Sequence, residues 1–150
     1  MTAPNRSLTE LVRGARSSHD FGPLLAAIPY AQFLGLGVTA QGGELVGTLR
    51  YSDHLIGNPA VPALHGGTIG ALLESTAIFT VLWQADTLVL PKTINITVDY
   101  LRAGKPTDTY CNAAITKQGR RVVNVYAVAY QDDVERPVAT ANAHFLVKPA

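Results

Sequence analysis

The chain has 150 residues, a formal charge of +1 and an apolar content of 47%. This length fits one domain with enough chain to bury a core. The charge near zero argues against general binding to nucleic acid or to membrane surfaces. A single cysteine, Cys111, excludes an intramolecular disulfide framework, and the histidines and acids show no metal-ligand spacing. We therefore expect no metal site.

The N-terminal part predicts short helices. Ser7 is placed to cap a helix that runs to Arg16, with Glu10 at the capping-box position. A second short helix is expected over residues 21–27, ended by Pro29. No apolar core of a secretory signal is visible here, so the expected compartment is the cytoplasm. We divide the chain into an N-terminal helical segment, residues 1–29, and a main part, residues 30–150.

Two strands are predicted next, over residues 33–40 and 44–52. Gln41-Gly42-Gly43 between them is typical of a tight hairpin turn. Residues 53–64 are rich in glycine and proline and predict an irregular loop.

A long helix is predicted from Gly66 to Ala85, and Glu74 is its only charged residue. A helix that is apolar on all sides is a buried helix. The stretch approaches the length of a membrane span, but its polar residues and the strand patterns after it argue against one. A carboxylate inside such a helix costs several kcal/mol unless it is paired, protonated or at a wet site. Glu74 is therefore either strongly compensated or present for its chemistry.

The start of this helix suits a developing negative charge. Gly66 and Gly67 supply backbone N–H groups at the positive end of the helix dipole, directly after His65. The glycines could also serve only a tight turn, and His65 could only cap the helix.

Four further strands are expected after the helix, joined mostly by hairpins. In the first of them, Ile94, Ile96, Val98 and Tyr100 are predicted to share one face. Alternating alanines in the last strand leave room for a helix to approach closely. The pattern favours an antiparallel sheet of about six strands wrapped around one long buried helix, an α+β fold. The four strands are predicted over residues 93–101, 107–117, 122–131 and 137–147.

This order of elements resembles a known family when it is read together with Leu64-His65-Gly66-Gly67 and an acid nine residues after the histidine. It looks like the hotdog-fold thioesterases, and most like the acyl-CoA thioesterases of the phenylacetate-pathway type. The likeness runs over residues 28–147 and implies a hotdog fold. Further stretches that look like the family are Leu34-Gly35-Leu36, Thr97-Val98-Asp99-Tyr100-Leu101-Arg102, Gly119-Arg120-Arg121 and Val138-Ala139-Thr140-Ala141.

The resemblance implies hydrolysis of acyl-CoA thioesters to the free acid and coenzyme A. It implies that the Gly66 N–H binds the thioester carbonyl and that Glu74 acts as general base or nucleophile. Asn58 would position water or the acid, and His65 would orient the loop. The acid comes from one subunit and the loop from the other, which implies a homodimer, possibly paired into a homotetramer. No separate cofactor is implied, because coenzyme A is part of the substrate.

Several cations could hold the phosphates of coenzyme A or could simply be solvated. Three of them cluster at a predicted hairpin and two follow the first strand after the helix. Together with the backbone of Gly67 they complete the candidate substrate contacts: Arg102, Lys105, Lys117, Arg120 and Arg121.

Two alternatives remain open. The stretch from His54 to Pro62 looks like the loop of β-hydroxyacyl-ACP dehydratases, which share the fold and use a histidine and a helix glutamate fourteen residues apart. Here Thr68 stands at that distance and Glu74 is twenty residues away, so the spacing disfavours dehydration. A hydratase or dehydratase using His54 and Glu74 is one alternative, and a non-catalytic acyl-CoA-binding dimer is the other.

Overall fold

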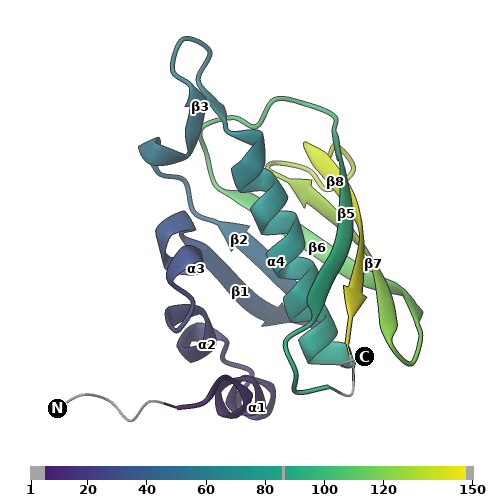
Figure 1. Ribbon diagram of the computed structural model, residues 1–150. Helices are drawn as coiled ribbons and strands as arrows, with labels where there is room; N and C mark the ends of the chain where they lie inside the picture. Colours follow the sequence, from purple (N-terminus) through teal and green to yellow (C-terminus); the bar gives the residue numbers. More distant parts are fainter. Residues whose placement is uncertain (1–5, 86, 148–150) are drawn as a thin grey trace, which may run out of the picture.

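The computed structural model describes residues 6–85 and 87–147, with three short helices ahead of a sheet and one long helix (Figure 1). The elements in chain order are α1 (Leu8–Ser18), α2 (Gly22–Ala26), α3 (Pro29–Leu34), β1 (Leu36–Gln41), β2 (Glu44–Leu49), a 3₁₀ turn (Asp53–Leu55), β3 (Ile56–Asn58), β4 (Ala63–Leu64), α4 (Gly66–Gln84), β5 (Lys92–Tyr100), β6 (Thr109–Gln118), β7 (Val122–Tyr130) and β8 (Ala139–Leu146).

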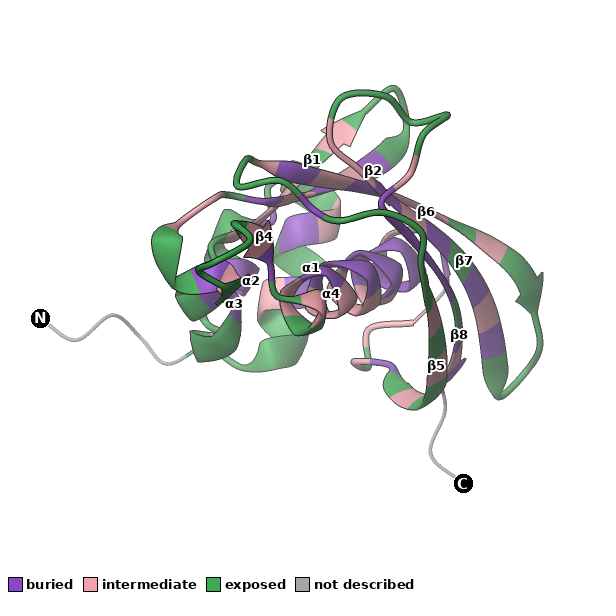
Figure 2. Ribbon diagram, turned by 90° about the horizontal axis from the view of Figure 1, so that it is seen from above, coloured by how far each residue is buried: buried purple, intermediate pink, exposed green. Residues whose placement is uncertain are grey.

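Six strands form one antiparallel sheet in the order β1-β2-β6-β7-β8-β5, and β3 pairs with β4 in a separate hairpin. The sheet curves around α4, which lies on its concave face (Figure 2). This is the hotdog arrangement, and the predicted α+β fold with about six strands around one long helix is confirmed. The strand β5 lies at one edge of the sheet, so half of its backbone hydrogen-bonding groups face away from the sheet.

Close packing between α4 and the sheet depends on small side chains. Ala139, Ala141 and Ala143 of β8 are at most 1% exposed, and they lie under a helix whose Leu73, Ala77 and Val81 are fully buried. A Cβ atom at Gly47 of β2 would overlap the side chain of Thr76. By length and composition α4 could cross a membrane, and half of that stretch is buried inside the protein.

The N-terminal helices share a core with α4. The predicted capping box is confirmed, because Ser7 and Glu10 each accept a hydrogen bond from the other's backbone. Phe21, just ahead of α2, packs edge-on against Phe79 and also contacts Trp83, both on α4. The segment therefore covers one side of the long helix.

The predicted short helix over residues 21–27 is confirmed as α2, which ends at Ala26, ahead of Pro29. The prediction that a strand begins at residue 33 is wrong. Pro29 instead begins α3, because its missing N–H is no loss in the first helical turn. The helix ends at Gly35, whose φ of 72° is the left-handed conformation that glycine adopts without strain. The strand β1 then begins at Leu36.

Candidate active site

The N-terminus of α4 is capped by His65. Its Nδ1 accepts a hydrogen bond from the backbone N–H of Gly67 at 2.9 Å, so a neutral ring carries its proton on Nε2. The Gly67 N–H is thereby occupied. The Gly66 N–H stands in the first helical position, where no intrahelical acceptor exists. It donates to no other acceptor in the described part of the chain. Gly66 is thus the backbone donor that remains for a ligand.

The position of His65 is fixed by the hairpin before it. Its backbone N–H donates to the carbonyl of Leu55 at 2.8 Å. A Cβ atom at Gly57 of β3 would lie 2.9 Å from the His65 Cα, so only glycine allows this approach. Gly57 was visible in the sequence only as part of an irregular loop, and its packing role needed the fold.

Tyr100, at the end of β5, lies over the first turn of α4. Its hydroxyl donates to the Gly66 carbonyl at 2.7 Å. A Cβ atom at Gly66 would lie 3.2 Å from the Tyr100 ring. Tyr100 was visible in the sequence as part of a strand face and of a family-like stretch, but its contact with Gly66 was not, because it joins residues far apart in the chain.

Glu74 lies two turns further along α4 and is half-buried. One carboxylate oxygen accepts a hydrogen bond from the Thr93 hydroxyl of β5 at 2.6 Å. Within residues 6–85 and 87–147 the one ion pair joins Lys105 and Asp132, so no described cation pairs with Glu74. Its carboxylate therefore keeps acceptor capacity beyond Thr93.

Thr93 reaches Glu74 because of a β-bulge. The register between β5 and β8 shifts between Thr93 and Asn95, which reverses the in–out alternation at that point. The prediction that Ile94 shares a face with Ile96 and Val98 is wrong, because Ile94 turns outward and is 57% exposed. Thr93 takes the inward position, and sequence reasoning missed it since a bulge leaves no periodic signal.

Gly66 and Glu74 of one chain are too far apart to act on the same atom. Eight residues of helix correspond to a rise of about 12 Å. A carbonyl oxygen bound to the Gly66 N–H therefore lies beyond the reach of the Glu74 carboxylate on the same helix.

The structure gives Asn58 and His54 local hydrogen bonds. Asn58 lies in the β3–β4 hairpin, which projects beyond the sheet (Figure 1), and its side-chain oxygen accepts from Ala60 N–H at 3.0 Å. His54 Nε2 donates to the Phe33 carbonyl, and its Nδ1 is 2.8 Å from the Ser52 hydroxyl. Both ring nitrogens of His54 are therefore engaged, one with α3 and one with Ser52 ahead of the 3₁₀ turn, and neither is hydrogen-bonded to Glu74.

The candidate cations fall into two groups at opposite ends of the sheet. Arg102 and Lys105 line a cleft beyond β5, near the start of α4. Lys117, Arg120 and Arg121 are exposed at the β6–β7 hairpin. The strand β7 between the two ends is about 26 Å long. The two groups of one chain do not form a single site.

Cys111 is fully buried among core residues. Burial raises the pKa of its thiol to about 12, and a neutral thiol is a poor nucleophile. Cys111 is therefore a core residue and not a nucleophile of the site.

Comparison with known proteins shows which family has this fold and sequence. A family model described as the acyl-CoA thioesterase N-terminal domain matches residues 57–146. A protein of known structure from Chromobacterium violaceum is 36% identical, with a TM-score of 0.76 over 93% of this chain and 97% of that one. One from Pseudomonas aeruginosa is 29% identical, with a TM-score of 0.73 over 93% of this chain and 98% of that one.

A protein from Ralstonia eutropha, described as a thioesterase related to phenylacetic acid degradation, is 26% identical. Its TM-score is 0.73 over 95% of this chain and all of that one. No curated protein matches. The fold is that of the hotdog thioesterases. The chain belongs to the acyl-CoA thioesterase family, and the resemblance inferred from its sequence is confirmed.

Proposed function

We propose that this protein hydrolyses acyl-CoA thioesters, with Glu74 as the reactive carboxylate and the Gly66 N–H as the oxyanion donor. The observation that carries the proposal is the state of Glu74. It is the only charge on a buried helix, it has no described cation beside it, and one hydroxyl holds it in place. Such a carboxylate lowers the stability of the fold, so its presence points to a role in function.

The chemistry follows from the groups present. The thioester carbonyl oxygen accepts from the Gly66 N–H at the positive end of the α4 dipole. Glu74 takes a proton from water as the water oxygen bonds to the carbonyl carbon. The negative charge that develops on the carbonyl oxygen is stabilised by the same N–H and dipole. The C–S bond then breaks, and the thiolate leaves without needing a strong acid.

Glu74 could instead attack the carbonyl carbon itself and form an anhydride that water cleaves. Single turnovers in H₂¹⁸O identify that route if the label appears in the Glu74 carboxylate.

The site is completed by a second copy of the chain. A single helix separates Gly66 from Glu74 by about 12 Å, so the two groups must come from different chains to share a substrate. Pairing through the edge strand β5 could bring Gly66 of one chain close to Glu74 of the other. One of its ends carries Thr93, which contacts Glu74, and the other carries Tyr100, which contacts Gly66. Antiparallel pairing of two β5 edges about a twofold axis brings Thr93 of one chain opposite the Tyr100 end of the other.

The activity is tested by measuring free thiol released from a panel of acyl-CoA thioesters. We expect turnover with at least one thioester by the wild-type protein and loss of it in Glu74→Gln. A fully active Glu74→Gln protein contradicts the assignment of Glu74. Absence of turnover across short-chain, long-chain and aromatic acyl groups favours the non-catalytic acyl-CoA-binding alternative.

The shared site is tested by mixing two inactive variants. Glu74→Gln lacks the acid, and Gly66→Val places a side chain against Tyr100 at the oxyanion position. If each site combines two chains, unfolding and refolding the mixture restores about a quarter of the wild-type activity, since a mixed dimer has one intact site. If each site lies within one chain, the mixture stays inactive.

A further inference from the structure

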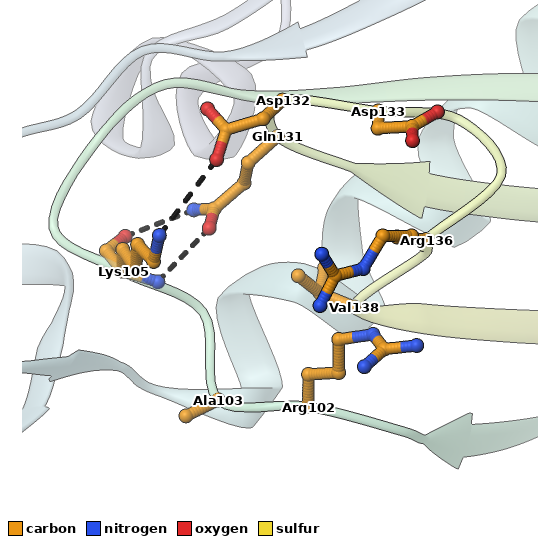
Figure 3. Close-up of a pocket in the computed structure, with 8 residues that line it drawn as sticks. All are labelled: Arg102, Ala103, Lys105, Gln131, Asp132, Asp133, Arg136 and Val138. Carbon is orange, nitrogen blue, oxygen red and sulfur yellow. Dashed lines mark hydrogen bonds and ion pairs between the residues drawn. The ribbon is translucent and has the colours of Figure 1, made fainter.

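The cleft lined by Arg102 and Lys105 lies between the β5–β6 loop and the β7–β8 turn, beside the proposed oxyanion position (Figure 3). Its volume is about 200 Å³. Sites that enclose a whole small molecule run to roughly 300–1,000 Å³, so this cleft fits part of a larger ligand. The residues lining it are Arg102, Ala103, Lys105, Gln131, Asp132, Asp133, Arg136 and Val138.

The shape of the cleft is fixed by hydrogen bonds to the backbone of its two loops. Gln131 clamps the β5–β6 loop, because its side-chain amide accepts from the Lys105 N–H at 3.0 Å and donates to the Lys105 carbonyl at 2.9 Å. On the other side, the buried Val138 accepts from the N–H groups of Leu101 and Arg102 through one carbonyl. The walls are therefore preorganised before any ligand arrives.

Two guanidinium groups are left without a counterion. Arg102 and Arg136 come from different loops and lie beside one another in Figure 3, and within the described ranges neither forms an ion pair. The nearby acids are engaged elsewhere. Asp132 pairs with Lys105 at 3.7 Å, and Asp133 accepts from the Glu135 N–H and points away from both arginines (Figure 3). Like charges held together in this way are stabilised by an anion between them.

The cleft is connected to the oxyanion position by short stretches of chain. Arg102 follows Tyr100 by two residues, which span about 7 Å when extended, and the Tyr100 hydroxyl binds Gly66. Gly104, between two lining residues, accepts from the Leu64 N–H at 2.9 Å, two residues before Gly66. A ligand that reacts at Gly66 and carries an anionic tail on a flexible arm can reach both places.

We infer that this cleft binds phosphate groups of the coenzyme A moiety, with Arg102 and Arg136 as the phosphate ligands of the same chain that supplies Gly66. The inference rests on the proposed function for its choice of ligand. Guanidinium groups match phosphate oxygens in bidentate fashion, which suits a pair of them facing one cleft.

The cations of the β6–β7 hairpin are the competing site. In the same chain they lie about 26 Å away along β7, at the far end of the sheet from Gly66. Unlike Arg120 and Arg121, the arginines of the cleft line a cavity whose walls are held by hydrogen bonds.

The test compares a coenzyme A thioester with the N-acetylcysteamine thioester of the same acyl group, which lacks the phosphates. We expect Arg102→Ala and Arg136→Ala each to raise the KM for the coenzyme A thioester about tenfold, the lower end for a charged hydrogen bond. The kcat should not change, because phosphate contacts bind the ground state and the transition state equally, and the KM for the short thioester should not change, because it has no phosphates. Arg13→Ala on α1 removes one exposed arginine remote from the cleft and is the matched control.

Three outcomes overturn the inference. One is an Arg136→Ala protein that behaves like Arg13→Ala on the coenzyme A thioester. A second is an equal loss on both thioesters, which indicates damage to the reacting centre or to the fold. The third is a KM effect confined to Arg120→Ala and Arg121→Ala.

Calorimetric titration with coenzyme A separates this inference from the proposed function. Binding that weakens about tenfold in Arg136→Ala but not in Arg13→Ala supports the cleft even if no thioester is hydrolysed. A wild-type protein that binds no coenzyme A overturns it.

Discussion

Thr93 donates its hydroxyl proton to Glu74 across 2.6 Å, and a β-bulge at Ile94 is what points it there. Without the bulge, Thr93 would face outward with Asn95 and the carboxylate would lie against an isoleucine. The register shift therefore gives the only charge on α4 a hydrogen-bond partner from the edge strand β5. Bulges of this kind recur beside active sites because they redirect one side chain.

The hydroxyl of Thr93 is expected to position Glu74 for reaction. Thr93→Val keeps the shape but removes the donor, so we expect kcat to fall about tenfold, equivalent to roughly 1.4 kcal/mol of transition-state stabilisation. Thr93→Ser keeps the donor and should retain most of the activity. Steady-state kinetics on both variants, with thermal melting on the same preparations, checks this. If Thr93→Val has a lowered melting temperature but a normal kcat, the hydrogen bond from Thr93 to Glu74 contributes to stability and not to catalysis.

Glu74→Gln should lower kcat by at least about 10²-fold, the usual contribution of a positioned base or nucleophile. The KM should change far less, because the carboxylate acts mainly in the transition state. Stability should be unchanged or higher, since a buried charge kept for function usually costs the fold. Glu44→Gln removes an exposed carboxylate on β2 and is the matched control. A destabilised Glu74→Gln protein with full turnover would identify a structural acid.

His65 is expected to act by capping α4. His65→Ala leaves the Gly67 N–H without its acceptor and should cost about 1 kcal/mol of unfolding free energy. His65→Asn restores a capping oxygen and should recover most of the stability and of kcat. Denaturant unfolding and thioester hydrolysis on both variants check this. Equal losses of kcat in the two variants, with stability restored only in His65→Asn, would instead indicate proton transfer by the histidine.

Some of the site could be predicted from sequence because its signal is local. One charge in an apolar helix, next to His-Gly-Gly, is visible without knowing any contact, and the long helix and the order of strands follow from periodicity. The contacts made across the fold were not predictable. Thr93 needed the bulge, and Tyr100 and Arg136 needed the pairing of β5 with β8 to come near Gly66 and Arg102.

The prolines and glycines also separate into features that the local sequence predicts and features that depend on contacts across the fold. Pro29 follows the end of α2 as predicted, but it also begins α3, since proline fits the first turn of a helix as well as a position just after a helix end. The sequence shows that Gly57 and Gly47 are glycines, but not why a side chain is excluded there. His65 leaves no room for a Cβ atom at Gly57, and Thr76 leaves none at Gly47.

Gly47→Ala should be the most destabilising single-methyl change on β2. The new Cβ would overlap the side chain of Thr76, which is fully buried and donates its hydroxyl to the Leu72 carbonyl at 2.8 Å, so neither element can yield easily. We expect a loss of about 2–3 kcal/mol of unfolding free energy, as for an overpacked core. Gly37→Ala on β1, where the nearest atom is the Thr48 Cβ at 3.9 Å, should be nearly neutral and is the control. Adding Thr76→Ala should recover part of the loss, because it removes the overlapping atoms. Denaturant unfolding of the four proteins decides the matter, and equal stability of Gly47→Ala and Gly37→Ala would refute close packing of α4 on β2.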